Sequence, residues 1–192
     1  MITFESKKEV SSVDDIYSEI NSRMIAALMF HDQMADYFTF LGLPGYAKIH
    51  SKQYHAEGRE REKIKTYYIQ RHGQIMNDKF TGKVEVIPKT WENVKSLAVG
   101  KGTKQKAVED GFLLYLEWEE ETEKLYETYS KALYDGGNVV DALKVGELAR
   151  HTAEELLMID AIMIDLISCG YDMAYITEKQ KCYTEKEVKK RG

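Results

Sequence analysis

Apolar residues recur at helical spacing along most of this chain and predict four long helices. The first helix runs to Leu41, and its apolar positions follow one another at intervals of three and four residues. It begins behind Ser11, which is followed three residues later by Asp14 as in a capping box, and it stops at the sequence Gly-Leu-Pro-Gly of residues 42–45. The apolar stripe consists of Ile16, Ile20, Met24, Ala27, His31, Met34, Phe38 and Leu41.

The second predicted helix, from Tyr46 to Gly73, has no good apolar face. Its best inward stripe contains Glu57 and Arg61, with Glu60 on the flank. Because so short a turn forces an antiparallel hairpin, this polar stripe should face the apolar stripe of the first helix. A buried carboxylate there is unfavourable unless it is protonated, pairs with a cation or binds a metal. The whole stripe is Ala47, His50, Tyr54, Glu57, Arg61, Ile64 and Tyr68.

A third helix is predicted from a Thr103 cap to Tyr134, followed by Asp-Gly-Gly at residues 135–137. Glu121 falls inside its apolar stripe and Glu117 lies beside it, one turn earlier. The apolar members of the stripe are Leu114, Trp118, Leu125, Tyr129 and Ala132. The remaining acids of this segment are interpreted as a solvated face, made of Glu119, Glu120 and Glu123.

A fourth helix is predicted from about Asn138 to Cys169, with His151 adjoining its stripe and Glu154 on the flank. The segment 156–167 is apolar almost all round, which predicts a place in the centre of a bundle or at a subunit contact. The stripe consists of Leu148, Thr152, Glu155, Ile159, Ile162 and Leu166.

The connection between the second and third helices is long, and it contains the only strand-like alternation, at residues 83–87. Thr90 caps a short predicted helix at residues 91–99. So long a connection predicts a crossover along a bundle, which would make the second and third helices parallel. We expect residues 1–176 to form one bundle domain and residues 177–192 to form a peripheral tail with at most a short helix from Thr177.

Composition narrows the class of protein. At 192 residues and 22.2 kDa the chain suits one domain, and its net charge of -5 argues against nucleic acid as a partner. Cys169 and Cys182 form no CxxC arrangement, which favours a reducing cytoplasm. No apolar run approaches the ~20 residues of a membrane span. The sequence therefore predicts a cytoplasmic protein with no membrane or nucleic-acid partner.

Several segments resemble the ferritin-like superfamily: DYFTFLGLPGY at 36–46, HAEGREREK at 55–63, TWENV at 90–94 and LYLEWEEE at 114–121. The resemblance covers most of residues 12–170. It implies an all-α, ferritin-like four-helix bundle with a long crossover and a di-iron centre, to which two helices each give one Glu and two give Glu-x-x-His. By position, Glu57 and Glu117 match two of these glutamates, and Glu154 or Glu155 matches the fourth helix.

The chain departs from that pattern in a coordinated way. Ala27 stands where the first-helix Glu is expected, Glu60 replaces the second-helix His, and the fourth helix offers His151 before Glu154. In a bundle with parallel second and third helices, these substitutions displace all ligands one turn in one direction, ~5.4 Å. The predicted metal ligands are therefore Glu57, Glu60, Glu117, Glu121, His151 and Glu154. His31 is either a core histidine or, with His50, a nitrogen ligand of a second or differently placed metal.

Two functional readings follow. The first is a metal-binding protein with a di-iron or related di-metal site, which oxidises or stores iron or performs another dioxygen-dependent oxidation as a ferroxidase-like enzyme; carboxylates and imidazoles suit iron, manganese and zinc. The second is a scaffold whose site has decayed, with acids paired to Arg61, Lys124 and Arg150, that serves as a structural or interaction module. In either reading the apolar segment 156–167, with Tyr37 and Phe40, predicts a homo-oligomer.

Overall fold

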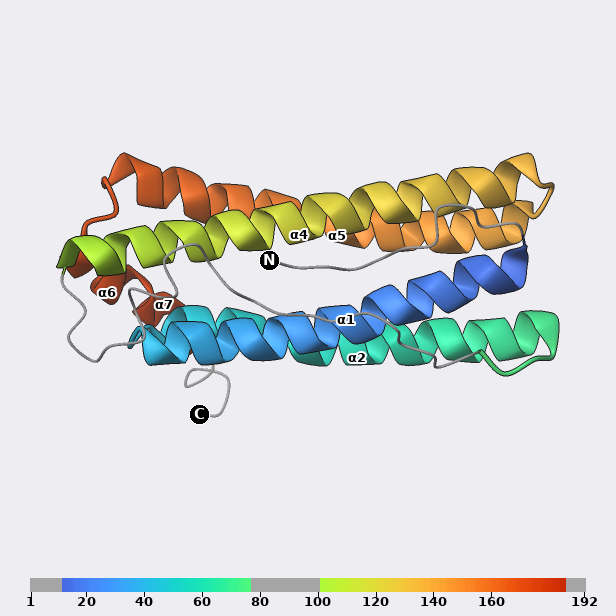
Figure 1. The fold of residues 1–192 in the computed structure, drawn as a ribbon, viewed down its shortest axis with the longest axis horizontal. Helices are drawn as coiled ribbons and strands as arrows, with labels where there is room; N and C mark the ends of the chain where they lie inside the picture. Colours follow the sequence, from blue (N-terminus) through green and yellow to red (C-terminus); the bar gives the residue numbers. More distant parts are fainter. Residues whose placement is uncertain (1–11, 77–100, 186–192) are drawn as a thin grey trace. The chain divides into compact units, whose positions relative to one another are not determined.

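The computed structural model describes residues 12–76 and 101–185, and every element in these ranges is a helix (Figure 1). The prediction of an all-α chain is confirmed for this part. The strand-like residues 83–87, the helix predicted at 91–99 and most of the crossover lie outside the described residues. The helices are α1 (Val13–Phe40), α2 (Pro44–His72), α4 (Lys101–Asp135), α5 (Val139–Ser168), α6 (Met173–Lys179) and α7 (Lys181–Glu185).

The chain divides into two compact units. The first contains Met1–Val108 together with Asp172–Gly192, and the second contains Glu109–Tyr171. The first unit therefore holds α1, α2, the start of α4, and the two short C-terminal helices. The second unit holds the rest of α4 and α5.

The first hairpin begins and ends close to the predicted residues. Ser12, one residue after the predicted Ser11, caps α1 by accepting a 3.1 Å hydrogen bond from the Asp15 amide. Pro44 occupies the first turn of α2, where its missing N–H has no helical partner to lose. The helix ends at Gly73, whose φ of 67° lies in the left-handed region that glycine adopts without strain.

Helices α1 and α2 pack along the predicted apolar stripe of α1, and all eight residues of that stripe are buried. Tyr37, which was expected outside the core, is buried as well, and its hydroxyl donates a 2.8 Å hydrogen bond to the carbonyl of Ala107 at the start of α4. That prediction was wrong because Tyr37 packs against the start of α4, which belongs to the same unit. Phe40 is partly exposed, as expected.

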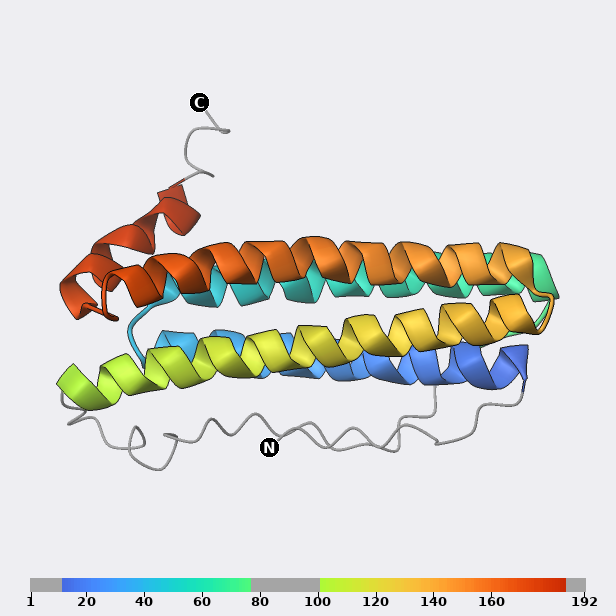
Figure 2. The same ribbon diagram turned by 90° about the horizontal axis from the view of Figure 1, so that it is seen from above.

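The second hairpin joins α4 to α5 through a tight turn at residues 136–138 (Figure 2). Gly137 has a φ of 80°, and the Asn138 amide bonds to the Leu133 carbonyl over 2.8 Å. Further along, the hydroxyl of Ser130 on α4 donates a 2.8 Å hydrogen bond to the carbonyl of Ala142 on α5. The α5 stripe predicted from the sequence is buried apart from Glu155, which is half-buried.

The buried stripe of α4 differs from the predicted one. It follows alternating steps of four and three residues, as in a heptad pattern, so that Glu119 and Thr122 lie within it. Leu114 and Leu125 are half-buried and Ala132 is exposed. The observed stripe is Val108, Phe112, Tyr115, Glu119, Thr122, Tyr126, Tyr129 and Leu133.

The C-terminal segment packs on the first hairpin, where the sequence predicted a peripheral tail. Asp172 caps α6 by accepting hydrogen bonds from two backbone amides, and Ile176 and Gln180 are buried. The Gln180 side-chain oxygen accepts a 2.7 Å hydrogen bond from the Gly45 amide at the start of α2. A Cβ atom at position 45 would lie only 2.0 Å from the Gln180 carbonyl oxygen, so glycine permits this close approach.

None of the helices in the described ranges combines the length and the hydropathy that crossing a membrane requires.

Candidate functional site

The most distinctive group of polar side chains in the first unit is a pair of histidines. His31 of α1 and His50 of α2 are 0% and 1% exposed, and their Nδ1 atoms lie 3.1 Å apart. Their ring centroids are 5.4 Å apart, and the rings are inclined by 33°. Each histidine belongs to the inward stripe predicted for its helix, and the short turn at residues 41–43 brings the two stripes together.

Aromatic rings surround this pair. Phe38 stacks on His50 with centroids 5.4 Å apart and an interplanar angle of 10°, and Phe30 meets the edge of His31 at 5.2 Å. Burial lowers the pKa of His31 to about 3. Burial, followed by repulsion from His31, holds the pKa of His50 well below its usual range. Both rings are therefore neutral at neutral pH.

A neutral pair at this separation can share one hydrogen bond. One ring must then carry its proton on Nδ1 and donate it, while the other accepts through Nδ1. Imidazole nitrogens also suit iron and zinc, but zinc sites use three or four protein ligands. No group of three or more His, Cys, Asp or Glu side chains suited to a metal ion occurs in the part of the chain that the structure describes. The pair is thus best understood as a hydrogen bond that joins α1 to α2.

The predicted ligands Glu57 and Glu60 lie on α2 in a charged neighbourhood. Both are partly buried, and Glu60 pairs with Lys63 over 3.0 Å. Arg61 donates a 2.8 Å hydrogen bond from its Nε to the side-chain oxygen of Asn21, which is fully buried on α1. Because Arg61 follows Glu57 by one helical turn, a permanent cation is fixed on the same side of α2 as that glutamate.

The α4 glutamates are arranged differently from the prediction. Glu117 and Glu121 are exposed, whereas Glu119 is only 2% exposed. The interpretation of Glu119 as a solvated residue was wrong, because the buried stripe of α4 follows heptad spacing through position 119. Glu120 is exposed and Glu123 half-buried. Two carboxylates of this helix are buried, Glu119 and Asp110.

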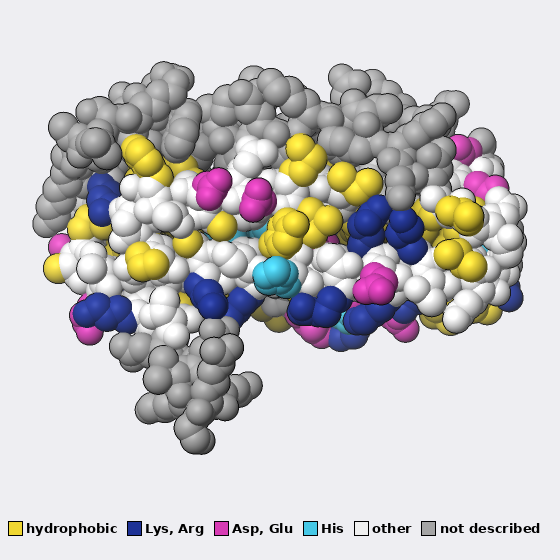
Figure 3. Space-filling view, turned by 90° about the horizontal axis from the view of Figure 1, so that it is seen from below, with side chains coloured by type: hydrophobic (Ala, Val, Ile, Leu, Met, Phe, Trp, Pro, Cys, Tyr) yellow, Lys and Arg dark blue, Asp and Glu magenta, His cyan; other side chains and the backbone are white. Residues whose placement is uncertain are grey.

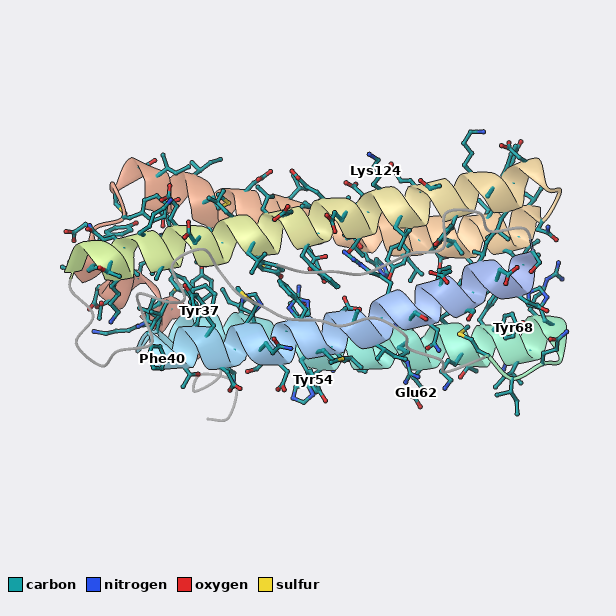
Figure 4. All side chains as sticks on the ribbon, viewed as in Figure 1. Tyr37, Phe40, Tyr54, Glu62, Tyr68 and Lys124 are labelled. Atoms are coloured by element: carbon teal, nitrogen blue, oxygen red, sulfur yellow. The ribbon has the colours of Figure 1, made fainter. Side chains whose placement is uncertain are left out.

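On α5, Glu154 is exposed and forms an ion pair with Arg150 one turn earlier. His151 and Glu155 are partly buried. Of the two alternatives weighed for this helix, Glu155 therefore lies closer to the buried stripe. Lys124, named as a partner for buried acids, is exposed and points away from the α4–α5 hairpin (Figure 4).

Within neither unit do the predicted ligands form a metal-binding group. Glu57, Glu60 and His31 belong to the first unit, and the remaining four predicted ligands belong to the second. Tyr54, expected on the inward stripe of α2, is 38% exposed and, like Glu62, points to the outside of the hairpin (Figure 4). Convergence of all six carboxylates and imidazoles stays a prediction.

Sequence reasoning missed several buried charged residues, among them Asp110 of α4. Arg23 of α1 is 2% exposed, and Asp141 at the start of α5 is 1% exposed. The signal for Arg23 was available: it follows Glu19 by one turn, and Glu19 is also buried. For Glu119, a step of three from Phe112 to Tyr115 and a further step of four lead to position 119.

No protein-family model matches this chain, and no curated protein sequence matches it. The functional argument therefore rests on the residues themselves.

Proposed function

We propose that this protein is a helical scaffold of ferritin-like architecture that serves as a structural or interaction module and has no working metal centre. The observation that carries this proposal is the Arg61 guanidinium, which Asn21 holds one helical turn after Glu57. A fixed cation occupies the stripe in which the resemblance predicts metal ligands.

Electrostatics favours this reading over metal binding. Arginine stays protonated at every physiological pH, and its guanidinium can neutralise a nearby carboxylate as a metal would. A divalent ion placed close to Arg61 would instead be repelled. Arg23, buried on α1 of the same hairpin, adds a second permanent charge. The acids of this hairpin thus have cations available without a metal.

The carboxylates of the second unit that were predicted as metal ligands support the same reading. Glu117, Glu121 and Glu154 are exposed, and Glu154 is paired with Arg150. A solvated carboxylate needs no metal to offset desolvation, because water already stabilises its charge. Neither unit therefore requires a metal to compensate these residues.

Metal content and the melting temperature test the proposal. Protein purified without chelator should contain far less than one iron, manganese or zinc per chain, and added iron(II) or manganese(II) should leave its melting temperature unchanged. Glu57→Gln should lower the stability of metal-free protein by weakening its pairing with cations. Glu120→Gln, at an exposed position of α4, is the control and should change little. Stoichiometric metal, with a metal-induced rise in melting temperature that Glu57→Ala abolishes, would refute the scaffold.

The second candidate is the metal-binding protein with iron-dependent or other dioxygen-dependent activity. The observation that favours it is the His31–His50 pair, two nitrogen donors 3.1 Å apart on facing helices. Cobalt(II) is a suitable probe because its visible absorption reports coordination. Absorption lost in His31→Asn would place the metal at the histidine pair, and absorption lost in Glu117→Ala would place it at the predicted glutamates. Absence of cobalt absorption would exclude both sites.

A further inference from the structure

The outward side of α5 carries a second heptad series, which we call the outer seam. Its members follow alternating steps of three and four residues along the whole helix, and all of them are exposed. A stripe with this spacing is the geometry by which one helix packs against another in a coiled coil. The outer seam consists of Val140, Leu143, Glu147, Arg150, Glu154, Leu157, Ala161, Ile164 and Ser168.

The outer seam is apolar at both ends and charged in its middle. Leu143, Leu157 and Ile164 are 68%, 70% and 66% exposed, which is unusual for side chains of this size. Between them lie Arg150 and Glu154, which pair within the helix, and Glu147, which pairs with Lys144. Arginine preceding glutamate is the less favourable order for such a pair, so the two charges gain little from each other.

We propose that the outer seam pairs antiparallel with the outer seam of a second copy of this chain. In a parallel pair, each seam residue would face its own equivalent, so that Arg150 would meet Arg150 and Glu154 would meet Glu154. Like charges that face each other across an interface are strongly unfavourable. An antiparallel pair removes this repulsion.

One antiparallel register pairs Arg150 with Glu154 twice and covers the apolar ends. With the two-fold axis level with residue 152, Arg150 of each copy lies opposite Glu154 of the other. In the same register Val140 lies opposite Ile164, and Leu143 lies opposite Ala161. Glu147, which pairs with Lys144 of its own helix, lies opposite Leu157. If the second copy were shifted by one heptad, so that the contacts moved towards the C-terminus of α5, Arg150 would lie opposite Ala161 and Glu154 opposite Leu157. A shift towards the N-terminus would leave Ile164 uncovered.

A groove beside the first half of the seam fits this arrangement. It has a volume of about 920 Å³ and lies between α4 and α5 within the second unit. The side chains that α5 contributes are mostly small, so a neighbouring helix can approach closely. In the proposed register, the half of the second copy that carries Leu157 and Ile164 lies along this groove. The small lining residues are Ala142, Gly146, Ala149 and Ala153.

The inference deepens the proposed function, because it names a second copy of the chain as a partner of the interaction module. It rests on that proposal only for the role of the dimer, and the pairing itself is argued from the residues of α5. Metal content tests the proposed function, whereas the oligomeric state tests pairing through the outer seam. The failure of the proposed function is therefore distinguishable from the failure of the pairing.

Sedimentation equilibrium of the full chain tests the pairing. Wild-type protein should be dimeric at micromolar concentrations. Arg150→Glu and Glu154→Arg should each raise the dissociation constant by about tenfold or more, because each places like charges opposite each other twice. The double variant R150E/E154R should restore the dimer, since the exchanged charges again face opposite partners. Lys181→Glu, in the exposed pair with Glu178, is the matched control and should sediment as wild type.

Disulfide trapping tests the orientation without relying on stability. In a background with Cys169 and Cys182 replaced by serine, a mixture of R150C and E154C proteins should form a cross-linked heterodimer in mild oxidant more readily than either protein cross-links with itself. Circular dichroism establishes that each variant is folded. A monomeric wild type, a dimer that neither charge reversal weakens, or a double variant that stays dissociated would overturn the proposal.

Discussion

At the scale of single residues, the first hairpin is joined by side chains whose protonation or charge is fixed. His31 and His50 can bridge α1 and α2 only while both are neutral, since two imidazolium groups 3.1 Å apart would repel each other. Arg61 and Asn21 bridge the same two helices through a hydrogen bond from a charged donor. The hairpin is therefore stabilised by one polar contact that protonation would break and by another that protonation leaves unchanged.

The histidine pair should make folding sensitive to acid. Burial lowers the pKa of His31 to about 3, whereas a histidine in the unfolded chain has a pKa near 6.5. Between these values the unfolded chain binds a proton that the folded chain does not bind. The contribution of the pair should be complete above pH 6.5. Below pH 6.5 the free energy of unfolding should fall by about 1.4 kcal/mol per pH unit from His31, with a further loss from His50, whose pKa is also lowered. Urea unfolding at pH 7.5, 6.0 and 5.0 measures this slope.

Variants separate this effect from the titration of carboxylates. The H31N/H50N double variant should show a shallower loss of stability between pH 6.5 and 5.0. His55→Asn, at an exposed position of α2, should retain the wild-type slope. Equal slopes in all three proteins would show that the histidine pair is not the acid-sensitive element.

The Arg61–Asn21 contact should contribute measurably to stability. Arg61→Met removes a charged donor from a buried amide and should cost about 1–3 kcal/mol in the free energy of unfolding. A double-mutant cycle with Asn21→Ala isolates the contact, because the two single losses should add to more than the loss in the double variant. Lys63→Met, which breaks an exposed pair with Glu60, is the control and should cost less than about 1 kcal/mol.

At the scale of helices, the sequence predicted α1 almost completely and α4 less well. The α1 stripe is apolar at nearly every inward position, so its period is unambiguous. In α4 the inward side includes Glu119 and Thr122, and the outward side includes Leu113, so hydrophobicity alone shifts the deduced stripe towards Glu121. The sequence therefore offers two competing stripes for α4, and the structure decides between them.

The close approach of Gln180, between α6 and α7, to the start of α2 could not be predicted from the hydrophobic pattern, because it depends on a backbone contact. Gly45→Ala should cost about 2 kcal/mol or more, since its new methyl group would overlap the Gln180 carbonyl. Gly102→Ala, on α4 with no atom within 4 Å of the added Cβ, should be neutral or slightly stabilising. Thermal unfolding of the two variants gives the comparison, and similar melting temperatures would contradict the close packing at Gly45.

At the scale of the whole molecule, charge is unevenly distributed among the helices. Helix α2 carries seven Lys and Arg against three Glu, whereas α1 carries one Arg against five Asp and Glu. Figure 3 shows dark blue Lys and Arg side chains gathered along one edge of the face that it presents. The spacing of charged and apolar residues in the sequence predicts well which residues share one face of a helix. It does not predict whether Glu57 meets Glu117, because that depends on two units joined through a long connection.

Pairing through the outer seam would make thermal stability depend on protein concentration. For a chain that unfolds as a dimer, each tenfold increase in concentration adds about 1.4 kcal/mol per mole of dimer to the free energy of unfolding. The melting temperature of the wild type should therefore rise when the protein concentration is increased from about 1 to about 100 µM. Arg150→Glu should show a much smaller rise. A wild-type melting temperature that is constant over this range would argue for a monomer.

The hydrogen bond from Gly45 to Gln180 has a consequence for the order of events during synthesis. Its two residues are 135 positions apart in the chain, so the ribosome completes α1, α2, α4 and α5 before it supplies the residue that closes the start of α2. Domains generally fold as they emerge, N-terminal parts first, and contacts of long sequence separation form late. Folding of the first unit can thus begin first and is completed last. The second unit can fold before the final helix of the first unit has been synthesised.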